Sequence, residues 1–238
     1  MLKKWLKKLP IPITQNHRYD IQAKKVIKKV LAKNSNCIDV GCHEGEFLDL
    51  FLKYAPQGNH FAFEPLPDYY DNLVKNYGQK CKIYPQALSD EKGESTFNYV
   101  ISNPAYSGLQ KRNYDKPNEK DTSITVQTDL LDQLLPAKTK IDFMKIDVEG
   151  GEYQVLKGAV KTLKENRPVV IFEHGLGAAD VYGTTPEMVY DLLVNEAGLK
   201  VSTMGAWLKG KESFSKKVFC QHFYENVDYY FMAFPNNL

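Results

Sequence analysis

Hydrophobic and polar positions alternate along the chain with two periods, one typical of helices and one typical of strands. Between residues 21 and 33, apolar side chains recur three and four positions apart with lysines on the other side, which predicts an amphipathic helix. Short apolar runs and further helical segments then take turns. Strands are predicted at about 37–40, 60–64, 82–85, 93–100, 124–128, 141–148, 169–172, 199–204 and 228–234. Helices are predicted at about 21–33, 46–54, 68–77, 155–163 and 185–196.

This order of elements predicts an α/β fold with a doubly wound, mostly parallel sheet. The chain has 238 residues and 43% hydrophobic content, enough for one domain with a sizeable core. We expect a single Rossmann-like domain over residues 21–238, preceded by a basic N-terminal arm over residues 1–20. The polar segment 102–121 is long enough to act as a lid or as an acceptor-binding element.

The arm has an apolar stripe of Leu2, Trp5, Leu6 and Leu9 among its lysines, and Pro10 ends it. No longer apolar region follows, so we expect no secretory signal, and no run reaches the roughly 20 apolar residues of a membrane span. The arm suits either peripheral contact with an anionic membrane surface or packing on the domain or a partner. Four cysteines without paired spacing are expected to be free thiols, which favours a cytoplasmic protein.

The net charge of the chain indicates whether nucleic acid is an expected partner. The formal net charge is only +2, whereas a protein that gathers nucleic acid through its overall field needs a large basic excess. We therefore expect no nucleic-acid partner. The sequence leaves the oligomeric state open.

A glycine turn follows the first predicted strand. Asp39, Gly41 and Gly45 give it the spacing D-x-G-x-x-x-G before a helix, and glycines allow a sharp turn that comes close to a ligand. The dinucleotide pattern G-x-G-x-x-G differs from this spacing. An acid in the turn would repel a pyrophosphate and attract an ammonium or sulfonium group, which favours S-adenosylmethionine (SAM) over NAD. A tight strand-to-helix connection without a ligand is the alternative.

Two later segments extend the candidate cofactor site. Glu64 and Pro65 end the second strand, where doubly wound folds present an acid to ribose hydroxyls; a helix cap or a surface ion pair is the alternative. Ala87 and Leu88 follow the third strand, where small apolar side chains can stack on a purine. Taken alone, that segment also fits an ordinary turn.

The most specific segment is D-F-M-K-I-D-V-E-G-G-E at residues 142–152. Strand alternation places Lys145, Asp147 and Glu149 on one side, with the two acids at the carboxyl end where open α/β sheets bind ligands. Buried charges need partners, so these groups should pair with one another, with a cofactor or with a substrate. A purely structural network is the alternative.

With these motifs, residues 37–173 resemble the FkbM family of SAM-dependent methyltransferases. The resemblance implies a class I methyltransferase fold with an antiparallel last strand, SAM as cofactor, and O-methylation of a hydroxyl on a small-molecule or carbohydrate acceptor. It also implies that the turn contacts the amino-acid end of the cofactor, that Glu64 contacts its ribose and that Asp147 lies near the methyl group. Cys42, His43 and Glu44 stand where the family has small residues or Asn, so their contacts are not carried over.

Transfer to a hydroxyl calls for a base that takes the proton. Asp147, Glu149 and His174 are the candidates, since they lie at the ends of two predicted strands and the ordinary pKa of histidine, about 6.5, suits this role. Asp147, Glu149, Glu173 and His174 could also ligate a divalent metal. Without a paired-histidine pattern, we expect no metal.

Three other functions remain open at this point. A nicotinamide-dependent oxidoreductase would share the turn and Glu64 but should have a third glycine. A nucleic-acid methyltransferase should have an aromatic N-P-P-Y type motif, to which residues 103–106 are only a partial likeness. A SAM-binding protein without activity is the third alternative.

Overall fold

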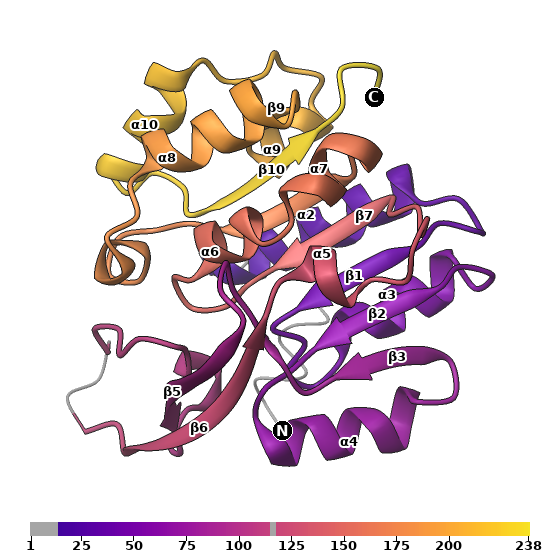
Figure 1. Cartoon of the computed structure of the whole chain (residues 1–238). Coiled ribbons are helices and arrows are strands. Elements are labelled where there is room, and N and C mark those ends of the chain that lie inside the picture. The colour runs from indigo at the N-terminus through magenta and orange to yellow at the C-terminus, as the bar shows by residue number, and fades with distance from the viewer. Residues whose placement is uncertain (1–13, 115–117) are drawn as a thin grey trace.

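The predicted strands of the α/β pattern assemble into a central sheet with the order β3-β2-β1-β7-β8-β10-β9 (Figure 1). The computed structural model describes residues 14–114 and 118–238. The strands of this sheet are β1 (Cys37–Val40), β2 (His60–Phe63), β3 (Cys81–Tyr84), β7 (Phe143–Ile146), β8 (Val169–Glu173), β9 (Lys200–Ser202) and β10 (Tyr230–Phe234). Neighbours from β3 to β8 pair in parallel, and β10 pairs antiparallel with both β8 and β9. The doubly wound, mostly parallel sheet with an antiparallel last strand is confirmed.

Helices cover both faces of the sheet because its buried strands carry apolar side chains on both sides. The helices are α2 (Gln15–Val30), α3 (Glu46–Tyr54), α4 (Pro67–Tyr77), α5 (Leu131–Leu134), α6 (Glu152–Lys157), α7 (Val160–Asn166), α8 (Pro186–Tyr190), α9 (Met204–Leu208) and α10 (Lys216–Tyr224). Cys37 and Phe143 pack with α2, α3, α4 and α9 in one core, whereas Ile38 and Met144 pack with α5 to α8 and α10 in the other. The result is three layers, visible in Figure 1.

A second, smaller sheet lies beyond the carboxyl ends of the parallel strands (Figure 1). It consists of β4 (Ala87–Leu88), β5 (Gly93–Val100) and β6 (Asp121–Asp129), in the order β4-β6-β5. The strands predicted at 93–100 and 124–128 are therefore present, but they do not extend the central sheet. The segment between β5 and β6 contains the short 3-10 helix η1 (Pro104–Tyr106).

The first helix begins earlier than the apolar pattern predicts. Thr14 caps α2 by accepting a hydrogen bond from the backbone N–H of His17, and Tyr19 in the second turn is buried. Capping by a threonine hydroxyl is a local signal that apolar spacing does not register. Residues 15–20 thus belong to the helix, and residues 1–13 of the predicted basic arm lie outside the described residues.

Two predicted helices are interrupted. The helix expected over 155–163 is divided into α6 and α7 around Gly158, where an added Cβ would lie 2.1 Å from the carbonyl oxygen of Ser89. The helix expected over 185–196 consists of α8 followed by the π-helix η3 (Asp191–Glu196). The short helices α5, α9 and α10 were not predicted.

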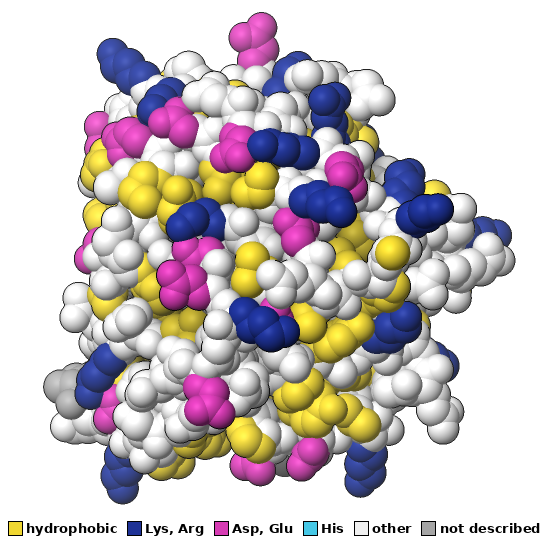
Figure 2. Space-filling model, viewed as in Figure 1, with side chains coloured by type: hydrophobic (Ala, Val, Ile, Leu, Met, Phe, Trp, Pro, Cys, Tyr) yellow, Lys and Arg dark blue, Asp and Glu magenta, His cyan; other side chains and the backbone are white. Residues whose placement is uncertain are grey.

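Helix length and surface charge both bear on contact with a membrane or a charged partner. Within residues 14–114 and 118–238, every helix is too short or too polar to cross a bilayer. Figure 2 shows basic and acidic side chains interspersed on the visible face, without a continuous basic patch there.

Candidate active site

The turn between β1 and α3 holds two glycines in a backbone conformation that L side chains rarely adopt. The φ angle is +73° at Gly41 and +85° at Gly45. An added Cβ would lie 1.9 Å from the carbonyl oxygen of Asp147 at Gly41 and 2.6 Å from the ring of Tyr77 at Gly45. Both positions therefore require glycine, because the turn packs directly on the end of β7 and on α4.

Lys145 is buried beneath this turn and connects it to β7. The register of β1 and β7 pairs Asp39 with Lys145, so both side chains point to the same face of the sheet. The Nζ atom lies 2.6 Å from the carbonyl oxygen of Gly41, 3.4 Å from a carboxylate oxygen of Asp39 and 3.8 Å from one of Asp147. Burial opposes the charge, yet the carboxylates of Asp39 and Asp147 raise the pKa of Lys145.

Glu64 presents a carboxylate held by backbone groups. Its Oε2 accepts the N–H of His43 at 2.8 Å, and its Oε1 accepts the N–H of Leu66 at 3.0 Å. Burial raises the pKa of Glu64, while these two hydrogen bonds lower it. Each oxygen keeps a free acceptor position, which suits the two hydroxyl donors of a ribose.

A cavity of about 470 Å³ opens at this edge of the sheet, within the usual size range of small-molecule sites. Five of the seven predicted cofactor residues line it: Gly41, Glu64, Pro65, Ala87 and Leu88. The remaining two do not. Asp39 lies beneath the turn against Lys145, and Gly45 packs on Tyr77. The predicted place of Asp39 at the cofactor is therefore corrected: of Asp39 and Lys145, only Lys145 lines the cavity.

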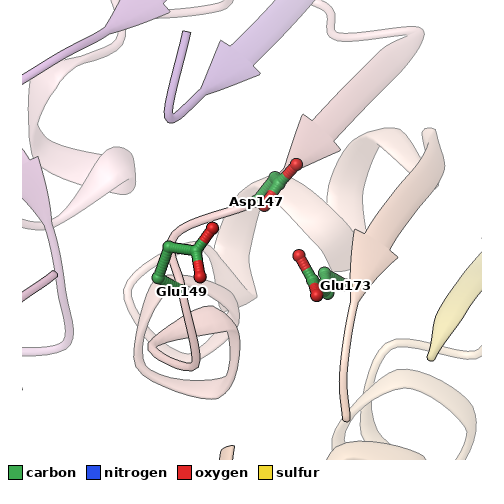
Figure 3. A group of neighbouring side chains, drawn as sticks. All are labelled: Asp147, Glu149 and Glu173. Atoms are coloured by element: carbon green, nitrogen blue, oxygen red, sulfur yellow. The ribbon is translucent and has the colours of Figure 1, made fainter. Parts of the chain in front are cut away.

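Three carboxylates meet at the ends of β7 and β8 (Figure 3). Asp147, Glu149 and Glu173 each offer an oxygen within 4.8 Å of the others. Glu173 follows the two-residue alternation of β8 onto the face that also carries Lys145. From the sequence, Glu173 was expected only as a possible metal ligand, although this alternation is the signal that distinguishes it from His174.

His174 points to the opposite face of the sheet. Its ring stacks on Phe223 of α10 with the centroids 4.5 Å apart, and only 1% of the residue is exposed. Burial lowers the pKa of His174 to about 3. The structure thus separates His174 from Asp147 and Glu149 and corrects its predicted place among the candidate bases.

The charges of the three carboxylates are only partly compensated. Arg112 forms an ion pair with Glu149, and Lys145 lies near Asp147. Burial, followed by repulsion from Asp147, raises the pKa of Glu149 to about 8, and the same causes raise that of Glu173. Both carboxyl groups are therefore harder to ionise than isolated ones.

The loop that carries Asp147 and Glu149 is fixed from within. Glu149 adopts a φ of +59°, which is strained for a residue with a side chain. The Oε1 atom of Glu152 accepts the backbone N–H groups of Val148 at 3.0 Å and Gly150 at 3.1 Å. Glu152 is almost fully buried, and burial raises its pKa to about 7. The last acid of the E-G-G-E sequence therefore stabilises the loop from below.

A second cavity, of about 570 Å³, adjoins the first. Asp147 and Glu149 line both cavities, so the two meet at the acidic group. Four tyrosines line the second cavity: Tyr19, Tyr106, Tyr229 and Tyr230. The hydroxyl of Tyr230 lies 3.4 Å from Asp147 Oδ2. Tyr106 and Arg112 come from the 102–121 segment, and its role as a lid or acceptor-binding element stays a prediction.

The same acids are the residues that could hold a metal ion among those described. Carboxylate oxygens suit Mg²⁺ or Ca²⁺, but Arg112 already neutralises Glu149, and His174 faces away. The expectation of a site without metal stays a prediction.

The strand order with antiparallel β10 between β8 and β9, together with a cavity at the carboxyl ends of β1 and β2, is that of the class I methyltransferase fold. The solved structure of a methyltransferase FkbM from Methylobacillus flagellatus KT has this fold. It aligns with a TM-score of 0.53 at 12% identity, over 86% of this chain and 44% of that one.

The chain belongs to the FkbM methyltransferase family, because residues 39–198 match the methyltransferase FkbM domain. The family and the fold point to SAM as the cofactor, and they remove the nicotinamide oxidoreductase alternative. The cavity fits this cofactor, since a buried acid faces it beside a glycine turn.

Curated relatives are similar over part of their length. The hexuronic acid methyltransferase AglP of Haloferax volcanii is 32% identical, over 67% of this chain and 62% of that protein. The 2-O-methyltransferase NoeI of Sinorhizobium fredii is 26% identical, over 55% and 59%. Methyltransferase sdnD of Sordaria araneosa is 28% identical, over 61% and 66%. This chain thus spans less than two thirds of the length of each.

Proposed function

We propose that this methyltransferase moves the methyl group of SAM to a hydroxyl oxygen of a carbohydrate-like acceptor. The observation that carries the proposal is that two cavities meet at Asp147 and Glu149. One cavity has the glycine turn and Glu64, and the other has tyrosines and carboxylates. Such an arrangement can hold a donor and an acceptor with their reacting atoms in line, which supplies much of the rate of a displacement reaction.

The residues around the first cavity would hold the cofactor. Gly41 brings its backbone to the cavity, Glu64 accepts the ribose hydroxyls, and Ala87 and Leu88 offer an apolar surface for the adenine. When bound, SAM supplies a methyl group made electrophilic by a positively charged sulfur. The excess of carboxylates over cations around the cavity favours a ligand with such a charge.

Asp147 is the base in this proposal. It lies where the cavities meet, and a carboxylate there can accept the proton of an acceptor hydroxyl as the new bond forms. Glu149 is engaged by Arg112, and the raised pKa of Glu173 suits a neighbour that shares the proton afterwards. For the in-line reaction, the chain otherwise only has to position the acceptor oxygen against the methyl group and exclude water.

The lining of the second cavity supports a hydroxylated ring as acceptor. Tyrosine rings offer flat apolar faces with a polar edge, and carboxylates accept hydrogen bonds from hydroxyls. The printed names of NoeI and AglP describe a 2-O-methyltransferase and a hexuronic acid methyltransferase. Because four acids line this cavity (Asp20, Asp147, Glu149 and Glu173), we propose that neutral sugars are better acceptors here than uronic acids.

The test is methyl transfer from isotopically labelled SAM to a panel of methyl glycosides: a neutral hexose, a 6-deoxyhexose and a hexuronic acid. The proposal expects label on a hydroxyl oxygen of a neutral glycoside and weaker labelling of the uronic acid. Label on nitrogen alone would contradict it. SAM binding without transfer to any hydroxylated compound would favour a protein that binds SAM without catalysis.

A further inference from the structure

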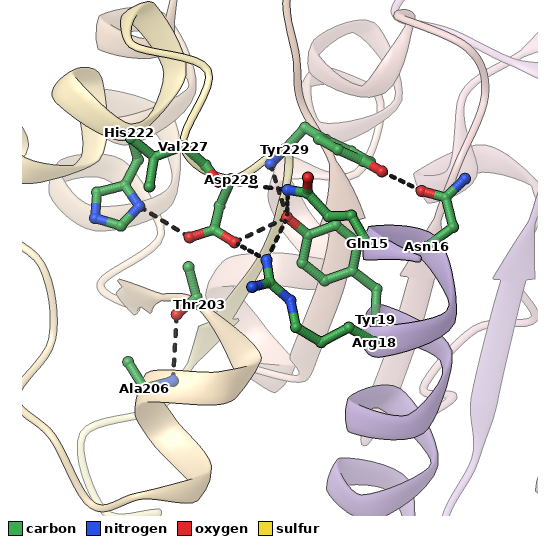
Figure 4. Close-up of polar contacts among 10 residues, drawn as sticks. All are labelled: Gln15, Asn16, Arg18, Tyr19, Thr203, Ala206, His222, Val227, Asp228 and Tyr229. Carbon is green, nitrogen blue, oxygen red and sulfur yellow. Dashed lines mark hydrogen bonds and ion pairs between the residues drawn. The ribbon is translucent and has the colours of Figure 1, made fainter. Parts of the chain in front are cut away.

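Asp228, in the loop between α10 and β10, joins three segments of the chain (Figure 4). Its Oδ1 accepts hydrogen bonds from Arg18 Nη2 at 2.9 Å and from the hydroxyl of Tyr19 at 2.8 Å. Its Oδ2 lies 3.2 Å from Nδ1 of His222 on α10. Tyr19 and Asp228 are 209 positions apart in the sequence, so this carboxylate connects the first described helix to the end of the fold.

Further hydrogen bonds between the same two segments surround this carboxylate. The hydroxyl of Tyr229 donates to Asn16 Oδ1, and the backbone N–H of Tyr229 donates to the hydroxyl of Tyr19 at 3.3 Å. Gln15 Nε2 donates to the hydroxyl of Tyr19 at 2.7 Å. A side-chain network of this kind stabilises through its connections, so losing its central acceptor loosens several contacts at once.

The two segments joined by Asp228, the start of α2 and the residues before β10, both line the second cavity, which is the proposed acceptor cavity. Asn16 and Tyr19 of α2 line it, as do Tyr229 and Tyr230. The acids at the ends of β7 and β8 line the same cavity, and the hydroxyl of Tyr230 lies 3.4 Å from Asp147 Oδ2. Asp228 itself lines neither cavity, and within the described part of α2 only Asp20 reaches the cofactor cavity.

We propose that Asp228 is a positioning residue for the acceptor: it holds the first two turns of α2 against the segment before β10, so that Asn16 and Tyr19 face the catalytic acids. The inference rests on the proposed function for the identity of the second cavity. If the cavity wall is already ordered before the acceptor binds, binding does not have to offset the entropy cost of ordering that wall. Loss of Asp228 therefore weakens acceptor binding and leaves the cofactor cavity intact.

The experiment compares Asp228→Ala and Asp228→Asn with Asp191→Ala. Asp191 forms a 2.6 Å ion pair with Lys216, which also lies on α10, but Asp191 lines neither cavity. With the best methyl glycoside of the panel, D228A should raise the acceptor KM about tenfold while the dissociation constant of SAM changes less than about twofold. D228N keeps one acceptor oxygen and should recover part of this loss. D191A should behave as the wild type.

Hydrogen exchange separates this inference from the proposed function, because it needs no acceptor. In D228A the amides of α2 should exchange about tenfold faster or more, with β7 and β8 unchanged. Faster exchange in α2 without any transfer to a hydroxyl would overturn the proposed function alone.

An unchanged KM in D228A, or a parallel rise in KM and in the SAM dissociation constant, would overturn the positioning role. If D228A fails to fold, Arg18→Gln, outside both cavities, should raise the acceptor KM in the same direction, and an unchanged KM there would overturn the inference too.

Discussion

The ammonium group of Lys145 donates a 2.6 Å hydrogen bond to the carbonyl oxygen of Gly41. This contact joins the strand that carries the acids of the site to the turn that borders the cofactor cavity. Because Lys145 also neutralises buried Asp39, one side chain stabilises both the cofactor site and the fold beneath it.

Lys145→Met is expected to lower the free energy of unfolding by about 3 kcal/mol or more, because Asp39 would be left buried without its cation. Urea denaturation measures this loss, and a SAM titration should show weaker binding as the turn loses its anchor. Lys164→Met is the matched control, since the pair of Lys164 with Glu196 is exposed and should contribute less than about 1 kcal/mol. Equal losses in the two variants would contradict the role of Lys145.

Glu64→Gln is expected to raise the SAM dissociation constant about tenfold to a hundredfold. An amide has one acceptor oxygen, whereas the carboxylate of Glu64 uses both oxygens for backbone N–H groups and offers both to a ribose. Calorimetric titration measures the change, and Glu196→Gln on the exposed surface is the control. Unchanged affinity in a folded Glu64→Gln protein would remove the ribose contact from the account.

Asp147→Asn is expected to lower kcat at least about a hundredfold, because the base is lost, while SAM still binds. His174→Leu should keep kcat within about threefold of the wild type. Its side chain packs against α10 on the opposite face of the sheet, so it can alter activity only through stability. Steady-state kinetics on the two folded variants decide whether Asp147 or His174 is the base. An inactive, well-folded His174→Leu variant beside an active Asp147→Asn variant would reverse the assignment.

The buried acid Glu152 predicts a pH dependence of stability. Burial raises its pKa from 4.5 to about 7 in the folded protein, so above pH 4.5 the unfolded chain releases a proton that the folded chain keeps. The contribution of the protonated group is complete below pH 4.5 and is lost as the pH rises through about 7. Relative to Glu152→Gln, the wild type should lose stability over this range in urea denaturation. A constant difference between the two proteins would show that Glu152 does not titrate there.

The sequence was sufficient for the features set by local patterns. Alternating elements predicted the central sheet, and the spacing of Gly41 and Gly45 predicted a turn that the structure confirms. The choice between Glu173 and His174 was also within reach. Neighbouring residues of a strand face opposite sides, so His174 could not share a face with Lys145 once Glu173 did.

Contacts between distant segments were beyond the reach of the sequence. Arg112 meets Glu149 from a segment with no regular period, so no pattern in the sequence indicated this ion pair. Tyr19 and Tyr229 come together only because α2 packs near the antiparallel strand β10. Such pairs depend on the packing of the whole chain, for which one sequence gives no local signal.

A crystal structure of the protein with S-adenosylhomocysteine, the product left after methyl transfer, tests most directly whether the two cavities hold donor and acceptor. We expect the ribose at the carboxylate of Glu64 and the sulfur facing the point where the two cavities meet at Asp147. A product molecule bound elsewhere, or one whose sulfur faces away from the second cavity, would contradict this placement.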